Sequence, residues 1–269
     1  MPLADTPARG RMMTVPEAEV TTDVVGGFGD ILKPDASWVT AGFPLPDGTF
    51  WAYREPGATV IAQRHRLKVT ANPLTRAHDR VQILDNAKHM YFSRARVAVP
   101  EGGALAVEVR IAARGFGTRA GDLYDGFVSY NLLDFESGCA FDFFIANDVI
   151  ATVYARLPFP GVPAPASGDP RYFAVFKELD LPTAPAQAHD YRISYDQGAA
   201  TVRWWVDGAL VNEEANVPDR IGGFTLAMGL MTEKDLSGGQ SVSLHGQGLM
   251  GEWSETRVTL TPGRTSPPA

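Results

Sequence analysis

The sequence of 269 residues has one cysteine, Cys139, and no long hydrophobic run. A single cysteine excludes an intrachain disulfide, which removes one mark of a secreted protein without excluding secretion. No run approaches the ~18 apolar residues that a membrane-spanning helix needs. The N-terminal residues lack the continuous apolar stretch of a secretory signal. We therefore expect a cytoplasmic protein with no membrane partner.

Positive charge is also sparse, with 24 Lys and Arg against 31 Asp and Glu and a net charge of −7. A nucleic-acid surface needs clustered Lys and Arg, so we expect no nucleic-acid partner. The sequence contains no Walker loop, dinucleotide fingerprint or G-x-S-x-G elbow. We expect no cofactor and no metal, with a structural calcium on Asp122 or Asp125 as the open alternative. Nothing in the sequence indicates the oligomeric state.

What is present is a series of strand patterns. Residues 104–111 alternate, with Leu105, Val107, Val109 and Ile111 on one predicted face. A second meander is predicted over Tyr191–Tyr195, Thr201–Val206 and Ala209–Glu213, and single strands over Phe224–Met231, Ser241–Leu244 and Thr256–Leu260. Many short strands joined by hairpin turns predict an all-β, two-sheet antiparallel sandwich or a barrel with little helix. We predict one domain over residues 23–260 between flexible segments 1–22 and 261–269.

Two short sequence motifs resemble those of a known family. His189–Ile193 (HDYRI) and Arg203–Gly208 (RWWVDG) resemble the H-x-Y-x-I and W/Y-V-D-G words of the concanavalin A-like lectin/glucanase superfamily. The order of strands and turns from about residue 93 to residue 260 is also similar to that superfamily. The resemblance implies a jelly roll with ligand in the concave face of one sheet. The chain is similar, too, to an uncharacterised family of actinobacterial jelly-roll proteins, which implies no activity.

Residues 127–157 predict three strands joined by turns at 136–138 and 147–148. The middle strand carries Asp142 between two phenylalanines. A three-residue first turn places Asp142 opposite Leu132, with Tyr130 and Asp134 on the same face. The third strand adds Ala151, Val153 and Ala155 to that face, and the predicted core face carries Phe127, Leu133, Phe141, Phe143, Ile145 and Ile150. A one-residue slip would reverse every assignment on the slipped strand.

The Asp142 face therefore predicts a cleft floor. Laminarinase-like glucanases of the superfamily carry E-x-D-x-x-E on a concave strand, as nucleophile, orienting residue and acid/base. Asp142 fills one of those positions and both glutamates are absent, which argues against double displacement of the usual kind. Asp142 is either a carboxylate satisfied at the sheet surface or a general acid/base whose pKa is raised by its aromatic neighbours.

Other candidates complete the predicted site. We assign Asp142, His245 and Tyr130 as catalytic, with a glycine-rich bend carrying a surface histidine as the alternative for His245. Adjacent Trp204 and Trp205 must point to opposite faces of a strand, so one is core and one is free to stack on a ligand. The predicted substrate-binding residues are Asp134, Tyr154, Arg156, Trp204, Trp205 and Gln247. For Arg156 the alternative is an ordinary salt bridge, and the proline-rich loop 158–171 is a lid or a surface excursion.

These features favour a cofactor-independent enzyme that binds a small, largely apolar molecule in the cleft. Non-redox acid/base chemistry of the cyclase, isomerase or lyase type, as in natural-product biosynthesis, would suit such a site. The alternative is a carbohydrate-binding lectin-like protein, or a glycoside hydrolase or lyase with non-standard catalytic residues. A structural or interaction module is the third possibility.

Overall fold

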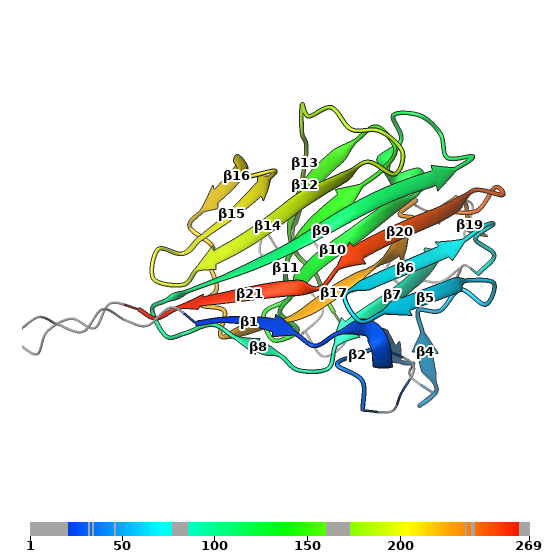
Figure 1. Ribbon diagram of the computed structural model, residues 1–269. Helices are drawn as coiled ribbons and strands as arrows, with labels where there is room; N and C mark the ends of the chain where they lie inside the picture. The colour runs from blue at the N-terminus through cyan, green and yellow to red at the C-terminus, as the bar shows by residue number, and fades with distance from the viewer. Residues whose placement is uncertain are drawn as a thin grey trace, which may run out of the picture.

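The computed structural model describes residues 21–263, apart from 32, 34, 46, 77–85, 160–172, 235, 238 and 239. Over these residues the chain forms strands and two short 3₁₀ helices, η1 (Phe28–Asp30) and η2 (Leu123–Asp125). Two antiparallel sheets stack face to face (Figure 1), which confirms the predicted all-β sandwich. In the described part of the chain, no helix is long and apolar enough to cross a membrane. The predicted flexible ends lie almost entirely outside the described residues, although strand pairing already begins at Thr21.

Sheet A contains nine strands in the described residues and lies in front in Figure 1. Its main path runs β16 (Ala209–Ala215), β15 (Thr201–Val206), β14 (Ala188–Asp196), β9 (Ala104–Phe116), β20 (Gly248–Ser254), β6 (Arg66–Ala71) and β5 (Thr59–Gln63). Beside β20, β9 also pairs with β21 (Thr256–Thr261), which in turn pairs with β1 (Thr21–Val25).

Sheet B, with eight strands in the same residues, lies behind sheet A in that view. Its path runs β13 (Phe173–Glu178), β12 (Ile150–Arg156), β11 (Cys139–Ile145), β10 (Phe127–Leu133), β17 (Gly223–Met231), β7 (Lys88–Ser93) and β2 (Trp38–Thr40), with β8 (Val97–Ala98) beside β17. Two separate hairpins are β3 (Gly42–Pro44) with β4 (Phe50–Ala52), and β18 (Leu236–Ser237) with β19 (Gln240–Ser241).

Most predicted strands are confirmed. The four apolar residues predicted on one face of β9 are buried, and the meander β14–β15–β16 turns at Asp207 and Gly208. Both turn residues have positive φ, 49° and 80°, as a tight hairpin of this twist requires. The strand predicted at 241–244 is wrong, because the carbonyl of Ser243 accepts a hydrogen bond from the Gln247 side chain (2.5 Å) and the strand ends at residue 241.

Strand β20 was not predicted, although it lies in sheet A between β9 and β6. Gly251 interrupts its hydrophobic pattern. A Cβ at that position would lie 2.3 Å from the ring of Trp253, so the glycine makes room for a fully buried tryptophan. The hydrophobic pattern of β20 is therefore interrupted where Gly251 accommodates the Trp253 ring.

The β10–β11 hairpin differs in register from the prediction. The amide of Asp134 donates to the carbonyl of Cys139 (2.8 Å), so the loop contains the four residues 135–138 rather than three. The Asp134 carboxylate accepts the amides of Glu136 (3.3 Å) and Ser137 (3.2 Å), and Gly138 has a φ of +85°. These bonds draw residue 135 into the loop. Asp142 consequently lies opposite Asn131 rather than Leu132.

The one-residue slip moves every β10 side chain to the other face. Tyr130 and Leu132 lie in the core between the sheets, whereas Phe127 and Leu133 lie in a second buried cluster on the outer face of sheet B. Those four assignments were wrong. The predicted positions of Phe141, Phe143, Ile145 and Ile150 in the inter-sheet core, and of Ala151, Val153 and Ala155 on the Asp142 face, are confirmed.

Candidate active site

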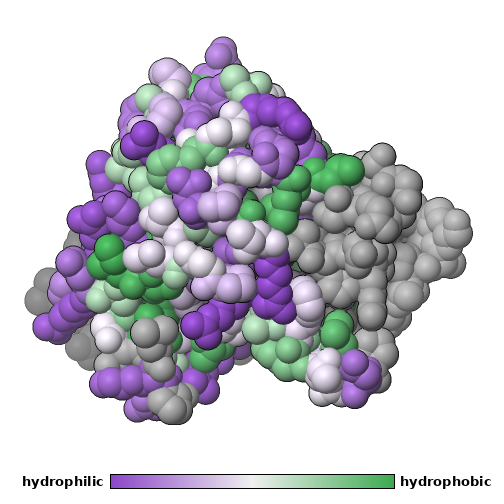
Figure 2. Space-filling model, turned by 90° about the vertical axis from the view of Figure 1, so that its right-hand side faces the viewer, coloured by the Kyte–Doolittle hydropathy of each residue, from purple (hydrophilic) through white to green (hydrophobic). Residues whose placement is uncertain are grey.

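A cavity of about 320 Å³ lies on the outer face of sheet B. Its volume is near the lower end of the roughly 300–1,000 Å³ range of ligand pockets. Strands β7, β10, β11 and β17 form the floor, and hairpin β3–β4 and residues 157–159 form walls. The lining residues are Phe43, Tyr53, Lys88, Met90, Phe92, Asn131, Leu133, Ala140, Asp142, Phe144, Leu157, Pro158, Phe159, Met231 and Glu233. On the side of the molecule seen in Figure 2, by contrast, hydrophobic residues form separate patches among hydrophilic ones.

Asp142 lies in this cavity from the middle of β11 and is 5% exposed. Its Oδ1 is buried and has no hydrogen-bond partner among the described residues. Asn131, directly opposite, donates its side-chain amide to Ser129 Oγ (3.1 Å) and to the Ala227 carbonyl (3.2 Å) instead. Burial, and secondly the negative charge of Glu233, raises the pKa of Asp142 well above its usual value. The site therefore favours a protonated carboxyl group that is ready to donate.

Glu233 and Lys88 are the two charged residues at the cavity that the sequence did not reveal. Glu233 follows β17, and its amide donates to the carbonyl of Tyr124 (2.9 Å). Lys88 begins β7, is 6% exposed, and holds its ammonium 5.3 Å from the ring centroid of Tyr53. No sequence motif marks either residue. The pairing of β17 with both β7 and β10 brings them to the cavity.

The same-face neighbours of Asp142 along β11 are Ala140 and Phe144, and neither can ionise. The second carboxyl group at this cavity is therefore supplied by another segment, the residues that follow β17. Two carboxyl groups in unequal environments are the arrangement that separates an acid from a base. Asp142 and Glu233 are two such carboxyl groups in one cavity.

Tyr130 and Tyr154 do not lie in the cavity. Both project into the inter-sheet core, where the Tyr130 hydroxyl and Thr256 Oγ1 are hydrogen-bonded at 2.9 Å. The Tyr154 ring packs on Phe141 and Phe173. Burial raises the pKa of both phenols above the usual value. The predicted position of Tyr130 on the Asp142 face is therefore wrong, because the register turns Tyr130 inward. Tyr154 is on the inner face of β12, so neither phenol is at the cavity.

Asp134 and Arg156 stabilise the β10–β11 loop. Asp134 caps the loop and pairs with Arg96 (3.1 Å). Arg156 donates its Nε to the carbonyl of Ser137 (2.9 Å) and pairs through Nη1 with Asp219 (3.1 Å). Neither residue lies at the sheet B cavity, so their ligand contacts remain predictions, and the salt-bridge alternative for Arg156 is confirmed.

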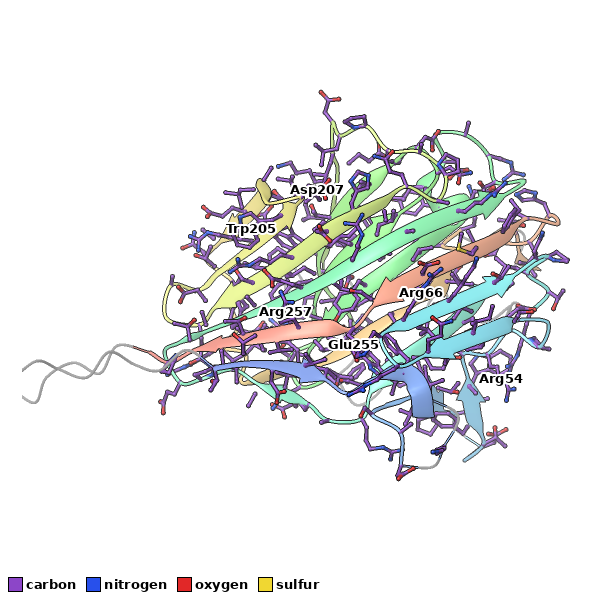
Figure 3. The ribbon with its side chains drawn as sticks, viewed as in Figure 1. Arg54, Arg66, Trp205, Asp207, Glu255 and Arg257 are labelled. Atoms are coloured by element: carbon purple, nitrogen blue, oxygen red, sulfur yellow. The ribbon has the colours of Figure 1, made fainter. Side chains whose placement is uncertain are left out.

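The two tryptophans divide as predicted. Trp204 is fully buried between the sheets, and Trp205 lies on the outer face of sheet A (Figure 3), with the guanidinium of Arg192 4.9 Å from its ring. That face is on the opposite side of the sandwich from Asp142. Neither tryptophan lies at the sheet B cavity, and Trp205 lines a separate hollow on sheet A, so its ligand contact remains a prediction.

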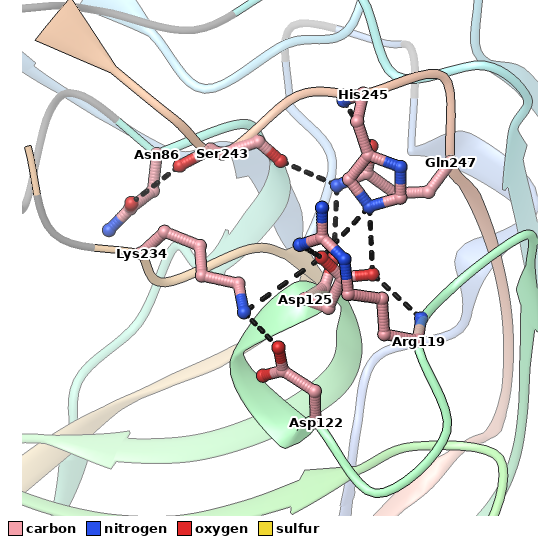
Figure 4. Close-up of polar contacts among 8 residues, drawn as sticks. All are labelled: Asn86, Arg119, Asp122, Asp125, Lys234, Ser243, His245 and Gln247. Atoms are coloured by element: carbon pink, nitrogen blue, oxygen red, sulfur yellow. Dashed lines mark hydrogen bonds and ion pairs between the residues drawn. The ribbon is translucent and has the colours of Figure 1, made fainter. Parts of the chain in front are cut away.

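His245 and Gln247 belong to a separate polar network around Asp125 (Figure 4). Nε2 of His245 lies 2.9 Å from both oxygens of the fully buried Asp125 carboxylate. The amide of Arg119 donates to the same carboxylate (2.8 Å), and Gln247 donates to the Asp125 carbonyl (3.1 Å). His245 is absent from the cavity lining, so the structure does not join it to Asp142.

The same network covers the predicted calcium candidates. Lys234 forms ion pairs with Asp122 and Asp125, so protein cations face both carboxylates. In the described part of the chain, no group of three or more His, Cys, Asp or Glu side chains is arranged to hold a metal ion. The proline-rich loop is largely outside the described residues, which resume at 173.

The fold is shared with carbohydrate-active enzymes of known structure. A laminarinase (endo-1,3-β-glucanase) catalytic domain from Thermotoga petrophila RKU-1 superposes with a TM-score of 0.56 at 13% identity, over 91% of this chain and 99% of that chain. The Crh5 transglycosylase in complex with NAG gives 0.52 at 13% identity, over 92% and 85%. An endo-β-1,4-glucuronan lyase from Trichoderma reesei gives 0.51 at 13%, over 83% and 94%.

At these identities the similarity shows the fold alone, and it confirms the jelly-roll sandwich that the family resemblance implied. No curated protein matches the sequence significantly. The profile of the Family of unknown function (DUF6081) matches residues 25–262, which is nearly the whole two-sheet domain. The chain therefore belongs to that family.

Proposed function

We propose that the protein is an acid–base enzyme that cleaves or transfers a glycosidic bond in the sheet B cavity. The observation that carries this proposal is the buried Asp142 carboxyl group, whose Oδ1 has no hydrogen-bond partner among the described residues, in one cavity with a second carboxyl group, Glu233. Asp142 is the proton donor. Glu233 is the second carboxylate, and Lys88 offers donors to sugar hydroxyls.

The reaction follows from these roles. Asp142 gives its proton to the oxygen of the leaving group as the carbon–oxygen bond of the acetal breaks. Glu233 either attacks the sugar carbon or takes a proton from an attacking water, and the separation of the two carboxyl groups in the complex decides which. Water or a second alcohol completes the reaction and Asp142 regains its proton. This scheme requires no second carboxylate on β11.

The fold supports a reaction on a carbohydrate over the cyclisation of an apolar molecule. A laminarinase, a transglycosylase and a glucuronan lyase all resemble this chain in fold, and their names state three different reactions on sugars. The fold alone therefore selects none of the three. The paired carboxyl groups favour cleavage or transfer assisted by an acid.

A second candidate is the cofactor-independent cyclisation or isomerisation of a small, largely apolar molecule. The mostly apolar lining of the cavity favours it. Asp142 would act alone as the acid in this case, and Glu233 would be dispensable. A cytoplasmic location fits this second candidate function best, and the location remains a prediction.

Sugar release and transfer by the purified protein would test the proposal. We would assay a panel of β-glucans, glucuronan and aryl glycosides with wild type, Asp142→Asn, Glu233→Gln and the matched control Asp190→Asn. Asp190 pairs with Arg110 on sheet A, away from the cavity. We expect each cavity variant to lower kcat/KM by about 100-fold or more, and the control to have no effect. Absence of release and transfer on every substrate would overturn the proposal.

A further inference from the structure

The two ends of the sheet B cavity differ in chemistry, because one end is charged and the other is aromatic. Along β7, Lys88 and Phe92 share a face at opposite ends of the strand, with Met90 between them. Lys88 pairs with Met231, and Glu233 lies just beyond that residue, so the two charged side chains enter from the same end. The other end, near Phe92, is aromatic.

Aromatic rings form a continuous wall at that second end. The ring centroid of Phe43 lies 5.7 Å from that of Phe135 and 5.8 Å from that of Tyr53, which is between the two ends because its ring is also 5.3 Å from the Lys88 ammonium. The ring centroid of Phe135 lies 5.1 Å from that of Phe159 and 5.5 Å from that of Phe92. Edge-to-face contacts of this kind hold rings in fixed positions. The wall therefore offers a preformed apolar surface.

Asp142 is level with Phe92 along the strands of sheet B, away from the end where Lys88 and Glu233 enter. Asp142 pairs with Asn131, which pairs with Ala227, which pairs with Phe92, so these residues form one row across sheet B. The row of Leu133 and Ala140 comes next toward the wall. Along the strand direction the proton donor is therefore level with Phe92 of the aromatic wall, with β10 and β17 between their strands, whereas Glu233 enters from the other end.

In glycoside cleavage the general acid lies on the side of the leaving group and the second carboxylate on the side of the sugar carbon. We infer that the leaving group of this enzyme is an apolar, ring-containing alcohol or phenol rather than another sugar. This inference rests on the proposed function and specifies its substrate class. A further sugar would leave its hydroxyl groups unpaired against phenylalanine rings, which is costly in a buried site.

Calorimetric titration of Asp142→Asn, which binds without turnover, would test the inference. The probes are the methyl and 2-naphthyl β-glycosides of glucose, galactose and xylose, with laminaritetraose as the oligosaccharide. We expect at least one naphthyl glycoside to bind tenfold or more tightly than its methyl counterpart and than the tetraose. Equal binding of methyl and naphthyl forms, tighter binding of the tetraose, or no binding of any naphthyl glycoside would overturn the inference.

A matched pair of substitutions locates the effect. Phe92→Leu removes a ring from the wall, and Phe176→Leu removes a half-buried ring from β13, on the same sheet and outside the cavity lining. In the Asp142→Asn background, Phe92→Leu should reduce the naphthyl preference at least threefold and Phe176→Leu should leave it unchanged. An equal effect of both would overturn the inference.

Turnover by wild type separates this inference from the proposed function. Naphthyl-dependent binding without release of naphthol would count against glycosidic cleavage and leave the apolar subsite in place. Release of sugar from the tetraose at a rate above that from every naphthyl glycoside would support glycosidic cleavage and overturn the apolar leaving group.

Discussion

Asp142 and Asp125 are both buried aspartates, and their surroundings are opposite. Asp125 accepts hydrogen bonds from Arg119 and His245 and is also close to Lys234. Asp142 has an Oδ1 without a partner in the described residues and faces the negative charge of Glu233. A satisfied buried carboxylate stabilises the fold, whereas an unsatisfied one costs free energy and persists where function needs it. The contrast separates a structural site from the proposed functional one.

The largest effect on stability should follow from Asp125→Ala. The substitution removes several charge-assisted hydrogen bonds from a fully buried group, each with a net contribution of about 1.5–3 kcal/mol. We expect the free energy of unfolding to fall by about 3–5 kcal/mol, as measured by urea denaturation. A loss below about 1 kcal/mol would show that the network is no stronger than a surface ion pair.

Asp142→Asn should have the opposite effect on stability. Because the native pKa of Asp142 is raised, the native state holds its proton where the unfolded chain has released it. Wild-type stability should therefore fall as pH rises above the unfolded value of about 3.9, until the raised native pKa is reached. The asparagine variant lacks this titration, so its advantage should grow by about 1 kcal/mol for each pH unit in that window.

Urea denaturation of both proteins from pH 4 to pH 8 would measure this difference. Asp190→Asn is the control for a change of charge at an exposed aspartate. Parallel pH profiles of wild type and Asp142→Asn would show that the Asp142 carboxyl has an ordinary pKa, and the contrast with Asp125 would fail.

The smallest effect is expected for His245→Ala. His245 is partly exposed at the edge of the Asp125 network, so its loss should lower the free energy of unfolding by about 1 kcal/mol. Turnover should change less than twofold, because His245 is not at the cavity. A large loss of turnover with normal stability would restore His245 as a catalytic residue and merge the two sites.

Local patterns were sufficient for much of the fold. The alternation in β9 and the hairpin at Asp207 and Gly208 involve neighbours in sequence, so the strands they predict are the strands observed. Strand β20 was missed because Gly251 makes room for a side chain of its own strand and breaks the pattern. The β10–β11 register was missed because a side chain, Asp134, sets the loop length.

For the site, the sequence identified Asp142 and little else. A carboxylate between two phenylalanines is unusual, so Asp142 could be recognised from the sequence. The residues of β12 that share a face with Asp142 were also predicted correctly. Glu233 and Lys88 carry no such mark. They reach the cavity through pairing of β17 with β7, strands far apart in sequence. His245, with its glycine neighbours, resembled a site residue but belongs to the Asp125 network.

The sequence by itself determined an all-β chain and its main hairpins, because strand periodicity and turn chemistry act between near neighbours. It also identified Asp142 as a candidate site residue, because its neighbours in the strand are phenylalanines. Only the tertiary structure decided which face each strand of sheet B turns to the cavity. It also decided that both faces are buried and that Glu233 and Lys88 accompany Asp142. Pairing between distant strands depends on contacts of the whole fold, and a shift of one residue reverses a face, so no local pattern can fix it.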